Sequence, residues 1–292
     1  MARSQLVPIT EDLLPDVCRF LHAEMNSEIP PEQWLDWLRY PWLENPPDYG
    51  FALIQPDEGV VGVMVAFYSE QTINGVTERF CNLAHYCATP KYRPESIRML
   101  RALLARKDMT LTAFSSTRRS VAIGKATGFR TLDDRVYIIP NVDLNPARKR
   151  LQVITDRDEI AARVDDRNRQ IIRDHGPSPI LKYTLITDGS DWCLSVHKVE
   201  ARKGVRFSVV LYPSDRTLFR QWLGAFLAAY RATDGTWLTL CQPRFLPTRP
   251  FLAIPVAEPR PHICRPKRID PERGDAPVDP AEITGLYSEL VR

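Results

Sequence analysis

The residues best suited to chemistry lie between positions 80 and 98. His85 stands in an apolar run, residues 80–87, that is predicted to be a strand, and imidazole titrates closer to neutrality than other side chains. It is a candidate general base, and the alternative is a histidine packed into the sheet. Lys91 and Arg93 follow in a turn directly before a helix, which suits a phosphorylated cofactor at the helix N-terminus. The alternative for these cations is a solvated helix face.

Two further groups carry charge or nucleophiles. A basic cluster between Arg148 and Arg173 suits the phosphates of a nucleotide, or a protein partner, while the acidic residues among its members favour a solvated helix. Ser195 and His197 share one face of a predicted strand, but no acid follows at position 199, so a hydrolase triad is not indicated.

Hydrophobic periodicity and turn signals predict the elements that position these groups, alternating between helices and strands. Helices are expected after Thr10 and at residues 31–40, 96–106, 120–127, 156–174 and 216–231. Strands are expected at residues 50–54, 60–68, 80–87, 110–114, 136–139, 182–186, 192–200, 205–212 and 237–241. The pattern predicts an α/β fold with a mixed sheet flanked by helices.

The length of 292 residues favours two domains, which we place at residues 1–145 and 146–292 on either side of a linker near Asn145-Pro146. The later strands and helix follow the same order as residues 50–114, which indicates a degenerate duplication. Many of the 25 prolines fall between Pro243 and Pro280, and this stretch is predicted to be extended and loop-like.

Composition narrows the class of protein. No run of apolar residues is long enough to span a bilayer, and no signal-peptide pattern opens the chain, so we expect a soluble cytoplasmic protein. The six cysteines form no CxxC pair, so we expect buried thiols and no metal site. A net charge of +3 does not by itself argue for nucleic acid.

The order of elements through residues 7–140 resembles that of the GNAT (GCN5-related N-acetyltransferase) superfamily. The family's cofactor loop has an Arg or Gln, two residues, a Gly, one residue, then Gly or Ala. Here it aligns with Arg93, Ser96, Ile97 and Arg98, so that Ser96 and Arg98 replace its two small residues. A serine can cap the helix and donate its N–H group. An arginine either obstructs a pyrophosphate or binds it as a fork of donors.

A second motif of the family ends in a Gly-Phe pair, which corresponds to Gly128-Phe129. Thr117 and Ser120 fall within the same frame. The tyrosine that the family commonly uses to protonate the departing thiolate aligns with Gly124. This departure puts the standard mechanism in doubt.

The resemblance implies an N-acyltransferase that uses acetyl-CoA or another acyl-CoA on a small amine or amino sugar. Leu83 and Tyr86 would then follow the pantetheine arm, and His85 or Glu24 would assist deprotonation. The loop also resembles GNAT-like proteins of bacterial polysaccharide gene clusters. The alternative is a non-catalytic GNAT-fold module that binds a nucleotide or protein partner. A third hypothesis, RNA modification, rests on the basic clusters alone and predicts steep salt dependence.

Overall fold

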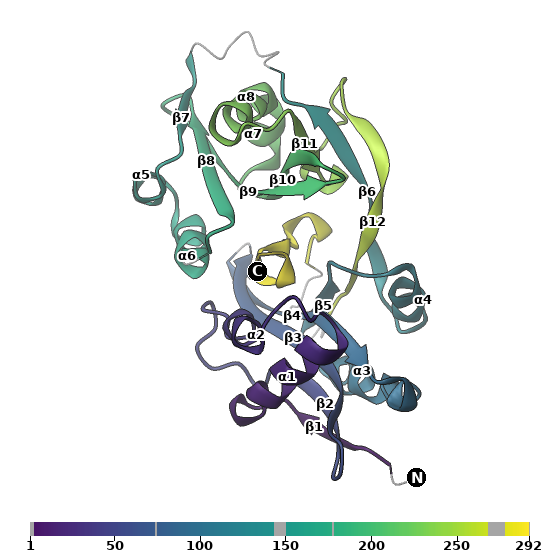
Figure 1. The fold of residues 1–292 in the computed structure, drawn as a ribbon. Coiled ribbons are helices and arrows are strands. Elements are labelled where there is room, and N and C mark those ends of the chain that lie inside the picture. The colour runs from purple at the N-terminus through teal and green to yellow at the C-terminus, as the bar shows by residue number, and fades with distance from the viewer. Residues whose placement is uncertain (1–2, 74, 143–149, 177, 268–277, 292) are drawn as a thin grey trace, which may run out of the picture.

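A computed structural model describes residues 3–73, 75–142, 150–176, 178–267 and 278–291. The strands of these residues form a 12-stranded mixed sheet in the order β1-β2-β3-β4-β5-β12-β6-β11-β10-β9-β8-β7. The predicted α/β class is therefore confirmed. Figure 1 shows two groups of helices on this sheet, with the end of the chain between them.

The first half contributes six strands and four α-helices. Its strands are β1 (Gln5–Pro8), β2 (Gly50–Gln55), β3 (Gly59–Ile73), β4 (Val76–Ala88), β5 (Thr110–Ala113) and β6 (Arg130–Pro140). Its helices are α1 (Leu14–Glu24), α2 (Pro31–Leu38), α3 (Ile97–Leu104) and α4 (Arg118–Ala126). Alternate residues of β3 reach different cores: Val63 and Val65 pack with α1 and α2, whereas Met64 and Ala66 pack with α3. This alternation explains the nearly continuous apolar run of β3, which is buried on both faces.

The second half repeats the order of strands, helix and strand. Its strands are β7 (Gln152–Ile154), β8 (Leu181–Thr187), β9 (Trp192–Arg202), β10 (Val205–Pro213), β11 (Leu238–Cys241) and β12 (Ile254–Arg265). Its helices are α5 (Arg157–Arg163), α6 (Asp166–His175), α7 (Arg216–Gln221) and α8 (Leu223–Asp234). Helices α7 and α8 connect the parallel strands β10 and β11 along the chain. In the same way, α3 lies between the parallel strands β4 and β5.

Two predicted helices are each divided in the structure. The helix expected at residues 156–174 becomes α5 and α6, because Asp165 accepts a hydrogen bond from the N–H of Asn168 and so caps a new helix. The helix expected at residues 216–231 becomes α7 and α8, which meet at Trp222.

The largest correction concerns the proline-rich stretch, where residues 254–265 form strand β12 instead of a loop. β12 lies between β5 and β6, and its pairing with β6 shifts register between Ala257 and His262, so Pro259 falls in the irregular segment. At Pro255, β12 pairs with β6 alone, and a proline without an N–H group is tolerated there. A bulge and an unpaired side thus admit prolines that ordinarily argue against a strand.

The last described residues form two short 3₁₀ turns, η7 (Gly285–Tyr287) and η8 (Glu289–Val291). η7 contacts both β3 and β10, so this segment lies between the two groups of strands, as the yellow ribbon in Figure 1 shows. Leu286 and Tyr287 are buried there. Residues at the end of the chain are therefore held against strands of both halves.

Candidate active site

The site begins where β4 and β5 separate. These parallel strands pair from Phe80–Thr110 to Asn82–Thr112, and β4 then continues to Ala88 paired with β3 only. The pairing of β4 with β3 shifts register between Leu83 and Tyr86, which marks a bulge just past the last β4–β5 pair. A strand that bends away from its parallel neighbour leaves a fork in the sheet.

The carboxylate of Glu289 occupies this fork. It accepts hydrogen bonds of 2.5 Å from the amide of Asn82, on β4, and 2.5 Å from the hydroxyl of Ser115, which follows β5. Asn82 is oriented in turn by Thr112, whose hydroxyl donates to the Asn82 carbonyl at 3.2 Å. One carboxylate thus bridges the two strands that separate, and its side chain is partly exposed.

Burial raises the pKa of Glu289, and the hydrogen bonds from Ser115 and Asn82 only partly oppose this rise. A carboxyl whose pKa moves towards neutrality is a better proton acceptor at physiological pH than an ordinary glutamate. Ser116, beside the fork, is buried, and its hydroxyl has no hydrogen-bond partner among the described residues. The fork therefore combines a carboxylate of raised pKa, that of Glu289, with the Ser116 hydroxyl, which has no hydrogen-bond partner among the described residues.

A cavity of about 260 Å³ adjoins the fork. Phe114 and Leu290, the chain neighbours of Ser115 and Glu289, line it on one side. Two carboxylates, Glu200 and Glu258, line it as well, and Arg202 lies near both, at 2.7 Å from Glu200 and 3.9 Å from Glu258. Lys198, Arg202 and Arg260 line the cavity too, so its two carboxylates are matched by cations of the protein.

His85 lies on the side of β4 that faces α1 and α2. Its ring is 4.9 Å from that of Trp34 in an edge-to-face arrangement, and burial lowers its pKa to about 4. Its Nε2 atom is buried with no hydrogen-bond partner among the described residues. Glu24 is exposed at the end of α1, and its backbone carbonyl accepts a hydrogen bond from the Cys87 thiol.

The turn after β4 brings two of the predicted cofactor residues together, because the hydroxyls of Tyr86 and Ser96 share a hydrogen bond. Ser96 is the N-cap residue of α3, yet its side chain makes no capping bond and donates instead to the Arg93 carbonyl at 2.7 Å. The Ser96 N–H group also donates to that carbonyl. Donation of this N–H to a cofactor, expected from the sequence, would therefore require the turn to open.

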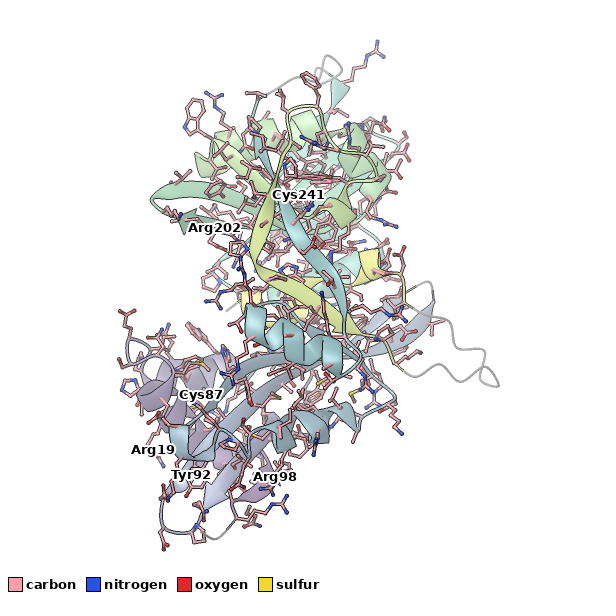
Figure 2. The ribbon with its side chains drawn as sticks, turned by 90° about the vertical axis from the view of Figure 1, so that its right-hand side faces the viewer. Arg19, Cys87, Tyr92, Arg98, Arg202 and Cys241 are labelled. Atoms are coloured by element: carbon pink, nitrogen blue, oxygen red, sulfur yellow. The ribbon has the colours of Figure 1, made fainter. Side chains whose placement is uncertain are left out.

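The two arginines of the turn differ in their surroundings. Arg93 is exposed, whereas Arg98 donates to the Ser4 carbonyl and to Glu95, each at 2.8 Å. Figure 2 labels Arg98 in the lower half of the molecule. Leu83 and Ile97 are partly buried against the core beneath α3. Arg98 thus ties α3 to the segment before β1.

Gly124 shows why the family's tyrosine has no place on this helix. A Cβ atom at position 124 would lie 2.7 Å from Cδ1 of Ile263, on β12. A larger residue would push β12 away from α4, which packs against it. The glycine that departs from the family pattern is explained by the close approach of β12.

The basic cluster lies partly outside the described residues, since Arg148 and Lys149 belong to the omitted segment. Three of its members pair with acids: Arg163 with Glu159, Arg167 with Glu282 and Arg169 with Asp166. Within the described ranges, no group of three or more His, Cys, Asp or Glu residues could hold a metal ion. No described helix is long and apolar enough to cross a membrane.

Glu289 was not predicted, because no motif surrounds it in the sequence. Its importance follows from contacts with residues 82 and 115, which are distant along the chain.

The sequence matches no protein-family model and no curated protein. Solved structures do match. The chain is similar to a GCN5-related N-acetyltransferase of Anabaena variabilis, with a TM-score of 0.59 and 13% identity over 90% of this chain and 72% of that one. A GCN5-related N-acetyltransferase of Kribbella flavida gives a TM-score of 0.56 and 15% identity over 89% and 70%. Eis1 of Mycobacterium abscessus gives a TM-score of 0.53 and 12% identity over 89% of this chain and 73% of that one. The chain therefore has the fold of the GCN5-related N-acetyltransferases.

Proposed function

We propose that this protein is an acyl-CoA-dependent N-acyltransferase whose general base is Glu289. The observation that carries the proposal is the Glu289 carboxylate, held between β4 and β5 by Asn82 and Ser115 in a fold of this kind. A base near neutral pKa is what transfer of an acyl group to a protonated amine requires. His85 and Glu24 remain the competing candidates, and the same assays compare all three.

In this mechanism Glu289 removes a proton from the acceptor amine. The nitrogen then forms its bond to the acyl carbon, and the bond from that carbon to the sulfur of coenzyme A breaks. The nitrogen gives up its second proton, and the departing thiolate takes up a proton to leave as the thiol. Asn82 and Ser115 hold the carboxylate in place. Backbone N–H groups of β4 beyond Asn82, which have no β5 partner, would polarise the thioester carbonyl.

We place the acceptor in the cavity between Phe114 and Leu290. A cavity of about 260 Å³ suits a small amine or an amino sugar. A role in cytoplasmic polysaccharide synthesis is the finer form of this proposal and rests on the loop resemblance alone. We also propose the division at residues 145 and 146, with β6 and β12 shared between the two units.

We place coenzyme A along Leu83 and Tyr86, with its pyrophosphate at the turn of Arg93, Ser96 and Ile97. Arg93 is exposed and suits a phosphate contact. Arg98 would join only by exchanging its bonds to Ser4 and Glu95.

A non-catalytic module that binds a nucleotide or protein partner is the second candidate. The observation in its favour is the turn itself, where the Ser96 N–H group and the Arg98 guanidinium already have partners.

Calorimetric titration with acetyl-CoA, followed by an amine-acetylation assay over small amines and amino sugars, separates the two. Binding with turnover that is lost in Glu289→Gln supports the enzyme. The exposed Glu70, which lies 3.4 Å from Arg79, provides the control variant Glu70→Gln. Absence of acetyl-CoA binding at millimolar ligand would sink the enzyme proposal.

A further inference from the structure

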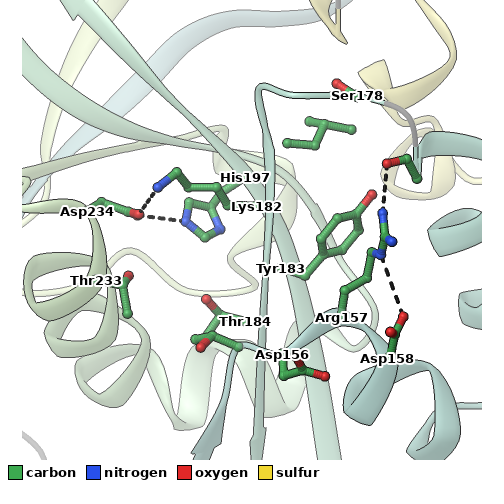
Figure 3. A pocket seen from close by; sticks show the side chains of 13 residues that line it. Asp156, Arg157, Asp158, Ser178, Lys182, Tyr183, Thr184, His197, Thr233 and Asp234 are labelled. Atoms are coloured by element: carbon green, nitrogen blue, oxygen red, sulfur yellow. Dashed lines mark hydrogen bonds and ion pairs between the residues drawn. The ribbon is translucent and has the colours of Figure 1, made fainter.

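A second polar cavity lies beside β8, the strand next to the last one in the sheet and well separated from β4 and β5 in the strand order. β7 pairs only with residues Leu185 to Thr187 of β8, so residues 181–184 have no strand neighbour on that side among the described residues. A cavity of about 440 Å³ opens there, between the start of α5 and the end of α8 (Figure 3). The cavity therefore lies along a part of β8 whose backbone has no strand pairing on that side among the described residues.

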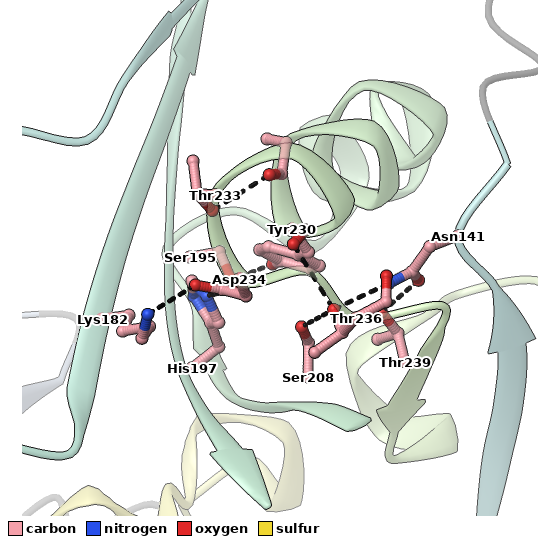
Figure 4. Close-up of polar contacts among 11 residues, drawn as sticks. Asn141, Lys182, Ser195, His197, Ser208, Tyr230, Thr233, Asp234, Thr236 and Thr239 are labelled. Carbon is pink, nitrogen blue, oxygen red and sulfur yellow. Dashed lines mark hydrogen bonds and ion pairs between the residues drawn. The ribbon is translucent and has the colours of Figure 1, made fainter. Parts of the chain in front are cut away.

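A buried polar group forms the wall of the cavity on the α8 side. Asp234 accepts hydrogen bonds from Lys182 at 2.6 Å and from Nε2 of His197 at 2.8 Å (Figure 4). The ring of Tyr230 packs over His197 with 4.3 Å between centroids. Because a carboxylate only accepts, Nε2 carries the proton, and burial disfavours a second proton by lowering the pKa of His197. Its Nδ1 atom is therefore a hydrogen-bond acceptor.

Three buried polar atoms around this cavity have no hydrogen-bond partner among the described residues: Nδ1 of His197, Oγ1 of Thr184 and the hydroxyl of Tyr183. His197 and Thr184 are each 1% exposed. They share one face, because Lys182 pairs with His197 and Thr184 with Ser195 across β8 and β9. Tyr183 lies on the other face of β8, where it pairs with Val196. An unsatisfied buried polar group costs about 1–3 kcal/mol, so the two atoms that share a face beside this cavity call for a ligand that satisfies them.

The charges of the cavity are already matched. Lys182 is paired with Asp234, and Arg157 donates to the Gly176 carbonyl at 2.8 Å and lies 3.9 Å from Asp158. Asp156, which also lines the cavity, caps α5 by accepting the N–H of Glu159 at 2.8 Å, so no cation of the lining is left over for an anionic ligand. One acceptor and one hydroxyl are instead groups that a hydroxyl-bearing ligand satisfies.

We propose that this cavity binds a small uncharged polyol of the sugar class, which donates a hydroxyl to His197 Nδ1 and exchanges a hydrogen bond with Thr184. The site is separate from the fork, and it does not depend on acyl transfer there. A volume of about 440 Å³ lies within the range of small-molecule sites.

The test is calorimetric titration of the full chain with D-glucose and myo-inositol, together with NMR of the His197 imidazole in the chains that retain it. D-glucuronate, D-glucosamine and triglycine serve as comparison ligands. We expect the neutral polyols to shift the His197 resonances saturably. Thr184→Val should weaken binding about fivefold, the worth of one hydrogen bond, while leaving thermal stability equal or higher.

Two variants sharpen the result. His197→Gln keeps an N–H group for Asp234 but removes the Nδ1 acceptor, so it should weaken binding to a similar degree. Thr233→Val is the control, because the Thr233 hydroxyl lines the cavity but already donates to the Ala229 carbonyl at 3.0 Å. The proposal is overturned if neither polyol binds at millimolar concentration, if Thr184→Val and His197→Gln bind as the wild type does, or if triglycine or a charged sugar binds in preference.

Discussion

The carboxylate of Glu289 lies 2.5 Å from the side-chain amide of Asn82, although 207 residues separate them along the chain. Asn82 marks the last pair between β4 and β5, so the contact fixes a carboxylate where the parallel strands separate. Ser115 holds the other oxygen. A carboxylate brought from the end of the described chain is thus held by two side chains of the first half.

Replacement of Glu289 by Gln tests its role as base. The amide keeps the shape of the side chain but cannot accept a proton, so kcat should fall by about 100- to 10,000-fold. Affinity for acetyl-CoA, measured by calorimetry, should change little because Glu289 is assigned to proton transfer. His85→Gln and Glu24→Gln, assayed in parallel, should retain most of kcat; a larger loss in either than in Glu289→Gln would transfer the assignment to that residue.

The stability of the wild type should depend on pH through Glu289. Its pKa in the folded protein is raised above the ordinary 4.5, so the folded state binds this proton more tightly than the unfolded state. The stabilising contribution is complete below pH 4.5 and is lost as pH rises through the raised pKa. Glu289→Gln should remove this component, which urea denaturation at a series of pH values would detect. An unchanged difference between acid and neutral pH would contradict it.

His85 should act in the opposite sense. Burial lowers its folded-state pKa from 6.5 to about 4, so its contribution to stability is present above pH 6.5 and is lost as pH falls through about 4. NMR titration should show a His85 imidazole that stays neutral down to about pH 5. Protonation of His85 near pH 6.5 would contradict its burial under Trp34.

Gly124 should tolerate a methyl group but not a tyrosine. In Gly124→Ala, Cδ1 of Ile263 can move aside, and the gain in helix propensity of up to about 1 kcal/mol offsets the contact. Gly124→Tyr overpacks the contact between α4 and β12 and should lower the free energy of unfolding by about 1–3 kcal/mol. Chemical denaturation of both variants measures the difference, and equal stability would show that β12 yields easily.

Substitution of Arg93 should affect coenzyme A binding, whereas substitution of Arg98 should affect the stability of the fold. Arg93→Ala removes an exposed cation and should weaken coenzyme A binding about two- to fivefold, as expected of a single surface charge contact. Arg98→Ala removes bonds to Ser4 and Glu95 and should lower the melting temperature. Calorimetric and thermal measurements on both variants test this. A greater loss of affinity in Arg98→Ala would show that Arg98 leaves Ser4 to bind the pyrophosphate.

Local signals in the sequence were enough for most of the first half. The apolar run of β3, the turn before α3 and the Gly128-Phe129 pair predicted the strands, helices and fold class, because these features depend on neighbours a few residues away. Helix breaks at Val164 and Trp222 were missed, since a capping side chain or a tight junction outweighed a continuous apolar stripe.

What the tertiary structure alone decided is the composition of the site. β12 forms in spite of its prolines, because a register shift and a side without a strand neighbour accommodate them. Its residue Ile263 explains the glycine at position 124. Glu289 reaches Asn82, and His197 reaches Asp234, only after distant segments pack together. Short-range patterns determined which elements form; contacts between residues far apart in sequence determined which polar groups meet, because burial and hydrogen bonding at these sites depend on the whole sheet.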